Sequence, residues 1–293
     1  MNVLCFDIGG TQIKAMIKSE TEEIELEGIK SRASEGAGAV KEDILAYILK
    51  LVEEYDIDGV AISTAGMVDP ATMTIAYANE NFKNYIGFDW PKLIKEEFNL
   101  PAAVENDVKS AALGEYYYGS GKDFDSLFAL TVGTGVGGAM IMDGRVYRGA
   151  SGQAGEIGYM PMDNTVLDKT GSTSSLINRG MELYPEKAYE NGLEIFEAID
   201  KGEAEAIDLM DYLTSQLAIG ISNIMLIANP RLILIGGGIS EQKEKFIDPI
   251  KEKIKAIVPA NIYDSTTITS TSLGNNSGMY GAYQNFLAKY KGE

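Results

Sequence analysis

The feature that most constrains this fold is a glycine turn between two apolar runs, which occurs twice in the chain. Residues 130–139 read LTVGTGVGGA and residues 5–11 read CFDIGGT. In both segments an apolar, strand-like run ends in glycines beside a threonine, and a second apolar run follows. We expect a chain that makes this turn twice to fold as two related halves, with a phosphate-bearing ligand between them.

Length and composition agree with such an arrangement. The 293 residues suggest about two domains, and 45% hydrophobic with 23% charged residues is ordinary for a globular protein. No apolar run has the length of a membrane span. The first residues lack a basic leader, so we expect neither a signal peptide nor a transit peptide. We therefore expect a cytoplasmic enzyme.

The rarest side chains exclude several kinds of chemistry. Cys5 is the single cysteine and histidine is absent, so an internal disulfide and Ser-His-Asp triads are excluded, and a zinc site has almost no ligands to draw on. The net charge of −18 disfavours nucleic acid and anionic membranes as partners. An ATP site in this chain would need backbone N–H groups and a divalent cation.

The first glycine turn has two interpretations. Gly9 and Gly10 could close an ordinary hairpin whose second strand covers residues 12–19. Alternatively, their N–H groups bind the phosphates of ATP, with Asp7 holding Mg²⁺, through water if not directly, and Thr11 donating its hydroxyl.

A strand over residues 102–105 ends in Glu105-Asn106-Asp107 and is followed by a predicted helix. A carboxylate at a helix start is commonly a cap. It can also be a general base that accepts a hydroxyl proton, with Asn106 orienting the substrate. Glu156, in a glycine-rich segment further on, could accept two sugar hydroxyls or simply be solvated.

Three other segments bear on ligand binding. A buried strand over residues 59–63 ends in a loop, the position at which open α/β sheets bind ligands. Residues 79–91, NENFKNYIGFDWP, suit a sugar-binding loop, or a surface loop anchored by a buried Trp90. A strand over residues 231–235 runs into three glycines and then a helix, which is a weak signal for a nucleotide site.

The helical patterns indicate packing rather than chemistry. An apolar stripe over residues 40–55 predicts a packed helix. Separate helices are expected over residues 193–200 and 203–213. Residues 217–228, LAIGISNIMLIA, are apolar nearly all round and predict a buried helix.

Taken together, these segments resemble the ROK family of sugar kinases, within the actin, hexokinase and Hsp70 superfamily. The motifs that carry the resemblance follow the family's order over essentially the whole chain: FDIGGT, STAGMVD, NFKNYIGFDW, VENDV, LTVGTGVGGA, SGQAGEIGY and LILIGGGIS.

The resemblance implies an α/β, two-domain actin-like ATPase (ribonuclease H-like) fold with ATP and sugar in the interdomain cleft. A small domain would cover residues 1–107, with the C-terminal helix 278–293 packing back on it, and a large domain residues 108–277. A homodimer is possible.

The resemblance also assigns roles to individual residues. Asp107 corresponds to the catalytic base. Sugar-binding positions are Gly66, Asn81, Asn106 and Glu156. The residues that face ATP and its Mg²⁺ are Asp7, Gly9, Gly10, Thr11, Gly133, Thr134, Gly135, Gly237 and Gly238.

Two departures from the family pattern affect the sugar site. Tyr159 replaces a histidine that contacts both sugar and zinc in most members, and the run NTVLDKTGSTSS replaces a cysteine-rich loop. We therefore expect no zinc, and Tyr159 as a sugar contact. A further family glutamate has no clear counterpart, Ser174 being the nearest, which leaves glucose, N-acetylmannosamine, fructose and β-glucosides open as substrates.

The sequence thus predicts an ATP- and Mg²⁺-dependent sugar kinase acting on a hydroxyl, most simply the 6-hydroxyl, of a hexose or a hexose-containing disaccharide. One alternative is a sugar-responsive transcriptional regulator, although the first glycine loop begins too early for the added DNA-binding segment of such proteins. The other is a catalytically silent sugar-binding member of the family.

Overall fold

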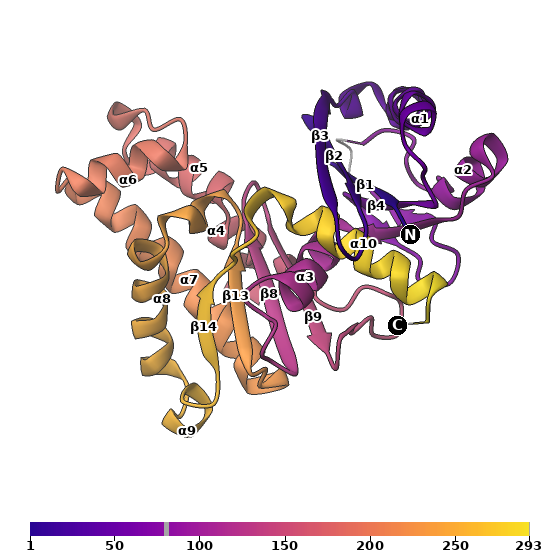
Figure 1. The fold of residues 1–293 in the computed structure, drawn as a ribbon. Helices are drawn as coiled ribbons and strands as arrows, with labels where there is room; N and C mark the ends of the chain where they lie inside the picture. Colours follow the sequence, from indigo (N-terminus) through magenta and orange to yellow (C-terminus); the bar gives the residue numbers. More distant parts are fainter. Residues whose placement is uncertain (79–81, 293) are drawn as a thin grey trace. The chain divides into compact units, whose positions relative to one another are not determined.

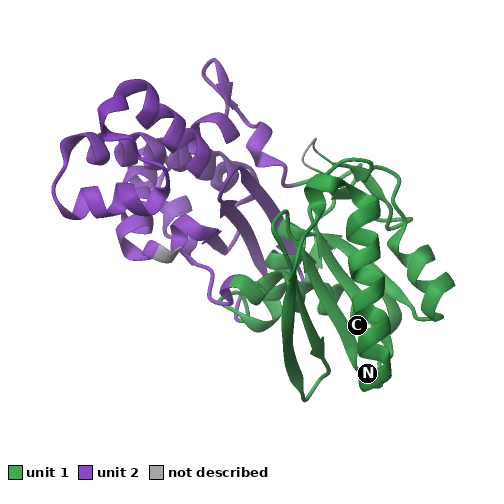
Figure 2. Cartoon of the chain, turned by 90° about the horizontal axis from the view of Figure 1, so that it is seen from above, with its two compact units in different colours: residues 1–122, 144–154, 275–293 green, residues 123–143, 155–274 purple. Residues whose placement is uncertain are grey.

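The structure, a computed structural model, describes residues 1–78 and 82–292. The chain forms two compact units, coloured green and purple in Figure 2. The first unit comprises residues 1–122, 144–154 and 275–293, and the second comprises residues 123–143 and 155–274.

The first unit is built on a five-stranded sheet of order β3-β2-β1-β4-β7 (Figure 1). Its central strands β1, β4 and β7 are parallel, whereas β2 and β3 are antiparallel additions. The predicted hairpin after the first glycine turn is therefore confirmed. The strands of this unit are β1 (Val3–Ile8), β2 (Gln12–Lys18), β3 (Glu23–Lys30), β4 (Gly59–Thr64), β5 (Met67–Val68), β6 (Ile75–Tyr77), β7 (Ala102–Asn106) and β10 (Arg145–Val146).

Helices cover both faces of this sheet because its side chains alternate between them. From β1, Leu4 and Phe6 join the core formed with α1 (Ala37–Glu54) and α2 (Trp90–Phe98). The intervening Cys5 joins a second core under α10 (Ser277–Tyr290). Of the apolar stripe predicted over residues 40–55, Val40, Ile44, Ile48 and Leu51 lie buried on α1, whereas Tyr55 is its C-cap and is partly buried.

Helix α3 (Asp107–Tyr118) crosses α10 at very short range, because glycines lie at the crossing. A Cβ atom on Gly281 would overlap the carbonyl oxygen of Ser110, and one on Gly114 would overlap that of Ser277. This packing joins α3 to the first unit. The units consequently divide after Lys122, whereas the sequence placed the division after Asp107.

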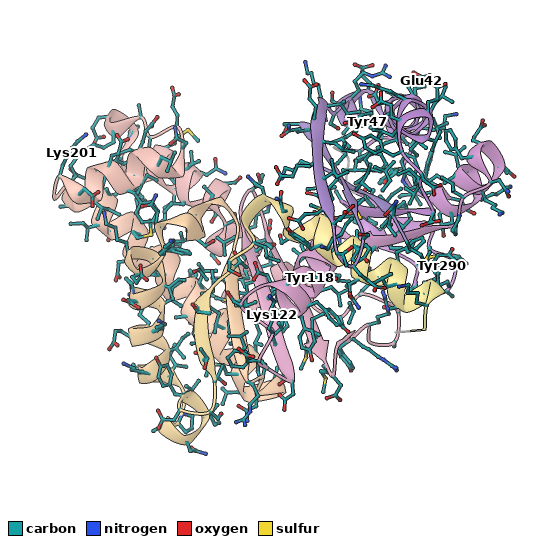
Figure 3. The ribbon with its side chains drawn as sticks, in the orientation of Figure 1. Glu42, Tyr47, Tyr118, Lys122, Lys201 and Tyr290 are labelled. Atoms are coloured by element: carbon teal, nitrogen blue, oxygen red, sulfur yellow. The ribbon has the colours of Figure 1, made fainter. Side chains whose placement is uncertain are left out.

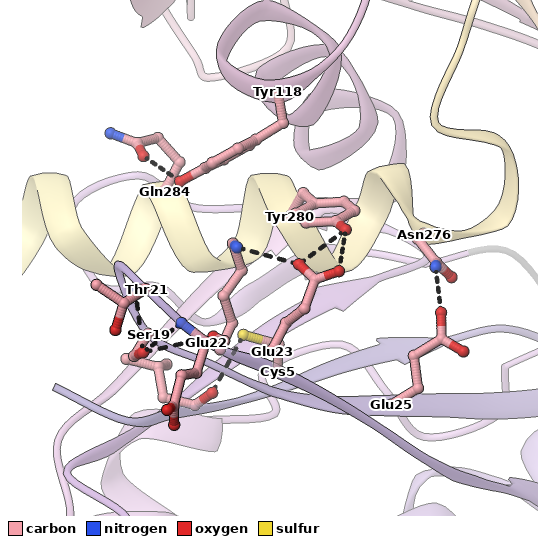
Figure 4. Close-up of polar contacts among 12 residues, drawn as sticks. Cys5, Ser19, Thr21, Glu22, Glu23, Glu25, Tyr118, Asn276, Tyr280 and Gln284 are labelled. Atoms are coloured by element: carbon pink, nitrogen blue, oxygen red, sulfur yellow. Dashed lines mark hydrogen bonds and ion pairs between the residues drawn. The ribbon is translucent and has the colours of Figure 1, made fainter.

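Side-chain hydrogen bonds fix α10 over the sheet (Figure 4). The Tyr280 hydroxyl donates to both carboxylate oxygens of Glu23 on β3, at 3.1 and 3.0 Å, and Asn276 donates to Glu25 at 2.8 Å. At the other end of α10, Tyr290, labelled in Figure 3, donates to the carbonyl of Ala102 at 3.0 Å. The helix is thus anchored at both ends to the strands it covers.

The second unit contains the strand order β9-β8-β13-β14, in which β8 and β9 form an antiparallel hairpin and β13 runs parallel to β8 and β14. Its strands are β8 (Ser126–Val132), β9 (Val136–Met142), β11 (Pro161–Met162), β12 (Thr165–Val166), β13 (Leu232–Gly236) and β14 (Thr267–Ser270). Its helices are α4 (Asp168–Gly171), α5 (Thr173–Leu183), α6 (Gly192–Asp200), α7 (Ala204–Ala228), α8 (Glu244–Ile257) and α9 (Ala260–Tyr263).

Helix α7 departs from the sequence prediction in two ways. It is continuous, where two helices were expected. Thr214 and Ser215, which lie at the expected break, are helical, and their hydroxyls donate to carbonyls four residues earlier, at 2.8 and 2.7 Å. Its second half is also not buried all round. Ile219, Leu226 and Ile227 are exposed, Ile227 by 85%.

Helix α5 was missed by the sequence analysis. Its first turn is rich in serine and threonine, which favour loops in the absence of a cap. Here Ser172 and Ser175 form a reciprocal capping box with bonds of 3.1 and 3.0 Å. None of the helices in the described part of the chain has both the length and the apolar character that a membrane span needs.

Candidate functional site

In the first unit, three parallel strands end at one edge of the sheet. Most of the site residues predicted for this unit lie at or just after these strand ends. The register aligns Asp7 with Ser63 and Glu105, and Ile8 with Thr64 and Asn106. The carboxyl ends of parallel strands are where open α/β sheets bind ligands. The predicted residues that this edge brings together are Asp7, Gly9, Gly10, Thr11, Gly66, Asn106 and Asp107.

Two side chains interact with Asp7. Ser63 donates to its Oδ1 at 2.7 Å, and the Lys14 ammonium lies 3.8 Å from its Oδ2. Burial raises the pKa of Asp7, while the bond from Ser63 and the charge of Lys14 oppose that shift. A Cβ atom on Gly278 would lie 2.9 Å from Oδ1, so the first turn of α10 requires glycine beside this carboxylate. Neither Ser63 nor Gly278 was assigned a role from the sequence, although Ser63 stands where the strand 59–63 meets its predicted ligand-binding loop.

The first glycine turn uses only one of its N–H groups internally. Gly9 donates to the carbonyl of Gln12 at 3.0 Å and closes the hairpin. Gly10 and Thr11 are exposed, and within the described residues no hydrogen bond involves their N–H groups. The turn is therefore a hairpin that also presents two backbone donors, which combines the two interpretations of its sequence.

Asn106 is the N-cap of α3 and orders its surroundings. Its side-chain oxygen accepts from the N–H of Lys109 at 3.1 Å, and its amide donates to the Gly66 carbonyl at 2.9 Å and to Asp107 Oδ1 at 2.8 Å. Both N–H groups of the amide are thus used inside the protein. Asp107 Oδ1 also accepts from the N–H of Val108 at 2.9 Å. These bonds fix the orientation of the Asp107 carboxylate.

The aromatic loop before α2 faces inward. Trp90 is fully buried and donates to the Tyr85 hydroxyl at 2.8 Å, and that hydroxyl pairs with Thr64 at 2.7 Å. Burial raises the pKa of Tyr85 to about 12. Phe82 stacks on Tyr85 with ring centroids 3.9 Å apart. Trp90 is therefore the anchor of a loop, and its ring is not a platform for sugar. The predicted sugar ligand Asn81 lies outside the described residues.

In the second unit, the turn between β8 and β9 is held from two sides. The N–H of Thr173 donates to the Gly133 carbonyl at 2.8 Å, and Asp168 accepts from the N–H of Val136 at 2.9 Å. A Cβ atom on Gly135 would lie 2.6 Å from Asp168 Oδ1. Asp168 was missed by the sequence analysis, since an aspartate in a polar run gives no sign of the distant turn that it supports.

The glycines after β13 lie beside this turn, because β8 and β13 are parallel neighbours. Gly237 has φ of 92° and ψ of 166°, a conformation almost restricted to glycine. A Cβ atom there would overlap the Val132 carbonyl. The two glycine segments of this unit thus form one surface.

A pocket of about 430 Å³ lies against that surface. Its walls are mostly apolar, with a few amide and hydroxyl groups, as is usual for a small-molecule site. The residues that line it are Gly133, Thr134, Thr173, Ser174, Ile177, Asn191, Gly192, Leu193, Phe196, Gly238, Ile239 and Gln242. Three of the predicted ATP-binding residues, Gly133, Thr134 and Gly238, are therefore brought to one cavity.

Glu156 and Tyr159 lie in the same unit, where Glu156 precedes a short 3-10 helix over Ile157–Tyr159. Gly155 and Gly158 pack on the backbone of β9, so that Cβ atoms on either would lie 2.5 Å from carbonyl oxygens of that strand. Glu156 is partly buried and the Tyr159 side chain is 63% exposed.

Within the part of the chain that the structure describes, no group of three or more Cys, Asp or Glu side chains is arranged to hold a metal ion.

Comparisons with known proteins agree with this architecture. A family model described as the ROK family matches residues 3–289. A beta-glucoside kinase of Listeria monocytogenes is 32% identical over 299 residues, which cover 98% of both chains.

Solved structures are similar over the whole chain. A ROK family protein from Streptococcus pneumoniae TIGR4 in complex with sucrose has a TM-score of 0.86 at 27% identity, covering 100% of both chains. A ROK family glucokinase from Streptomyces griseus in complex with glucose and AMPPNP has a TM-score of 0.82 at 25% identity, covering 97% of this chain and 98% of that one. The predicted two-domain α/β, actin-like ATPase fold is thereby confirmed.

Proposed function

Because the chain belongs to the ROK family, we propose that it is an ATP- and Mg²⁺-dependent sugar kinase that transfers the γ-phosphate to a hydroxyl of a hexose or of a hexose-containing disaccharide. The 6-hydroxyl is the proposed acceptor. The observation that carries the proposal is the junction of β7 and α3, where Asn106 fixes the Asp107 carboxylate at the ligand-binding edge of a parallel sheet.

Asp107 is the proposed general base. Phosphoryl transfer requires mainly positioning and charge stabilisation, and a fixed carboxylate that accepts the hydroxyl proton fits that requirement. The bonds from Asn106 and Val108 both end on Oδ1. We propose that this carboxylate receives the proton of the attacking hydroxyl.

The nucleotide is proposed to occupy the 430 Å³ pocket of the second unit. Its apolar walls suit a base and ribose, and Gly133 and Thr134, which are part of its lining, would meet the phosphates. The exposed N–H groups of Gly10 and Thr11 in the first unit are proposed as further phosphate donors.

The residues present also fit a magnesium ion. Mg²⁺ typically keeps several waters and takes one or two carboxylates beside substrate phosphates. Asp7 is a single carboxylate, 21% exposed at the ligand-binding edge, and would hold the ion, through water if not directly. Bound there, the ion would neutralise phosphate charge, for which a chain of net charge −18 has few cations of its own.

Sugar recognition is proposed to rest on polar groups, since the aromatic rings of residues 82–90 face inward. Gly66, Asn81, Asn106, Glu156 and Tyr159 are the proposed contacts. The Asn106 amide has no spare N–H group, so it could only accept from the sugar. The likeness to a beta-glucoside kinase favours a β-glucoside, such as a β-linked disaccharide, as acceptor. The proposed location is the cytoplasm, where ATP and Mg²⁺ are available.

A coupled assay of ADP release tests the function. Glucose, N-acetylmannosamine, fructose, cellobiose and related glucosides would each be offered with ATP and Mg²⁺. We expect release that depends on one of these sugars and stops on chelation of Mg²⁺. Sugar binding without ADP release would instead indicate a silent sugar-binding member, and tight, sugar-dependent binding to DNA would indicate a regulator.

Asp168 provides a prediction about the phosphate turn. A hydrogen bond to a charged group contributes about 1.5–3 kcal/mol. Asp168→Ala should therefore loosen the turn and raise the KM for ATP by about tenfold, since each tenfold corresponds to about 1.4 kcal/mol. Asp168→Asn keeps an acceptor for the Val136 N–H and should stay near the wild type. Equal KM values for ATP in the alanine variant and the wild type would contradict this role.

A homodimer remains a proposal. The exposed Ile219, Leu226 and Ile227 on the second half of α7 form an apolar face that self-association would cover.

A further inference from the structure

Glu105 is a buried carboxylate next to the proposed catalytic junction. It is 1% exposed and lies one residue before Asn106 at the end of β7. Its Oε1 accepts from the N–H of Asn106 at 2.9 Å. Its Oε2 has no well-angled hydrogen bond within the described residues, but lies 2.6 Å from a guanidinium nitrogen of Arg148. A buried charge without its partner is strongly destabilising, so Glu105 depends on Arg148.

Arg148 begins a tight loop, residues 148–154, that belongs to the first unit. The loop is closed by a bond from the N–H of Ala154 to the Arg148 carbonyl at 3.2 Å. Gly149 and Gly152 take positive φ angles of 64° and 79° within it. This backbone fixes the position of the Arg148 Cα atom, from which the side chain extends. The Arg148 side chain is 32% exposed.

A second cationic side chain, that of Lys109, also binds this loop. Lys109, in the first turn of α3, is only 2% exposed, and its ammonium donates to the Gly152 carbonyl at 2.5 Å. Its backbone N–H donates to the Asn106 side chain. The loop and the β7–α3 junction are therefore joined twice, by a loop cation on a strand carboxylate and by a helix cation on a loop carbonyl.

Asn106 connects these contacts to the proposed base. Its N–H is bound by Glu105, and its amide donates to Asp107 Oδ1 and to the Gly66 carbonyl. Loss of the positive charge beside Glu105 would therefore shift Asn106, and through Asn106 the orientation of the Asp107 carboxylate.

We propose that Arg148 is a positioning residue for the phosphoryl transfer: by neutralising the buried Glu105, it lets Asn106 hold Asp107 in the orientation of a base. The inference rests on the proposed kinase function. In this role Arg148 touches neither substrate, and its effect passes entirely through the carboxylate of Glu105.

A double-substitution cycle tests the proposal, with kcat, the KM values for ATP and sugar, and thermal stability measured for each variant. Arg148→Met should lower kcat by about tenfold or more, equivalent to about 1.4 kcal/mol, with the KM for ATP little changed. Glu105→Gln removes the buried charge but keeps an acceptor for the Asn106 N–H. The double variant should therefore recover most of the lost kcat and stability, and Arg148→Lys should recover part of them.

Arg145→Met is the matched control, since Arg145 is exposed on the neighbouring strand β10 and should behave as the wild type. A double variant as slow as Arg148→Met would overturn the proposal, because it would mean that Arg148 acts on substrate directly. Lost stability with an unchanged kcat in Arg148→Met would also overturn it. If the wild type released no ADP with any sugar, the proposed function itself would fall, and this inference with it.

Discussion

Asp107→Asn is expected to lower kcat for sugar phosphorylation by about 10²- to 10⁴-fold, the usual contribution of a general base. The asparagine oxygen can still accept from Val108 and from the Asn106 amide, which both bind Oδ1 in the wild type. The helix start should therefore survive, and thermal stability and nucleotide affinity should change little. Steady-state kinetics and a thermal melt of the same preparation measure the two effects.

Asp89→Asn is a suitable control for that variant. Asp89 also stands at a helix start in the first unit, where it caps α2 by accepting from the N–H of Lys92 at 2.9 Å. It has no proposed part in the reaction, so its replacement should leave kcat at the wild-type level. Near-normal turnover in Asp107→Asn would remove Asp107 from the role of base.

The second large effect is expected at Gly237. Its backbone conformation costs a side-chain-bearing residue about 1–3 kcal/mol, and a Cβ atom would also overlap the Val132 carbonyl, where overpacking typically costs about another 1–3 kcal/mol. Gly237→Ala should therefore reduce the free energy of unfolding of the second unit markedly. The strain would also displace the neighbouring β8–β9 turn and weaken the binding of an ATP analogue.

The adjacent Gly238 supplies the comparison. A Cβ atom there meets nothing within 4 Å, and its φ angle is not in the positive range. Gly238→Ala should therefore keep the wild-type free energy of unfolding, measured by chemical denaturation. Equal stability of both alanine variants would show that the close packing at Gly237 is not what shapes the site.

The parts of the fold that the sequence predicted are those in which local pattern and long-range packing agree. The glycine turn at Gly9 and Gly10 gave the β1–β2 hairpin, and the apolar alternation around it gave strands at their observed positions. The ROK family and the fold class were recognised from motifs in order and are confirmed. The roles of individual site residues, Asp107 and Glu156 included, remain predictions.

What the sequence could not give depends on partners that are distant along the chain. Asp168 supports Val136 from 32 residues away, and Arg148 pairs with Glu105 from 43 residues away. Nothing in a polar run identifies such partners. The capping box of α5 was missed because serines and threonines are equally typical of loops. The break expected within α7 was wrong, since Thr214 is helical there and its hydroxyl donates to the carbonyl of Met210.

The composition of a loop likewise did not fix the direction of its side chains. Residues 82–90 contain aromatic and amide groups that suit sugar binding, but Trp90 and Tyr85 are both buried and bonded to each other. The free energy gained by burying these large aromatic rings favours their inward orientation, whereas a stacking platform for sugar would need them exposed.

The most direct test of the central claim is phosphorus NMR of the product formed from ATP, Mg²⁺ and the best sugar of the ADP-release screen. The account predicts one new phosphate monoester signal, coupled to the protons at carbon 6, which grows in step with ADP and is absent with Asp107→Asn. ATP bound and hydrolysed to inorganic phosphate, with no sugar phosphate from any sugar offered, would contradict it.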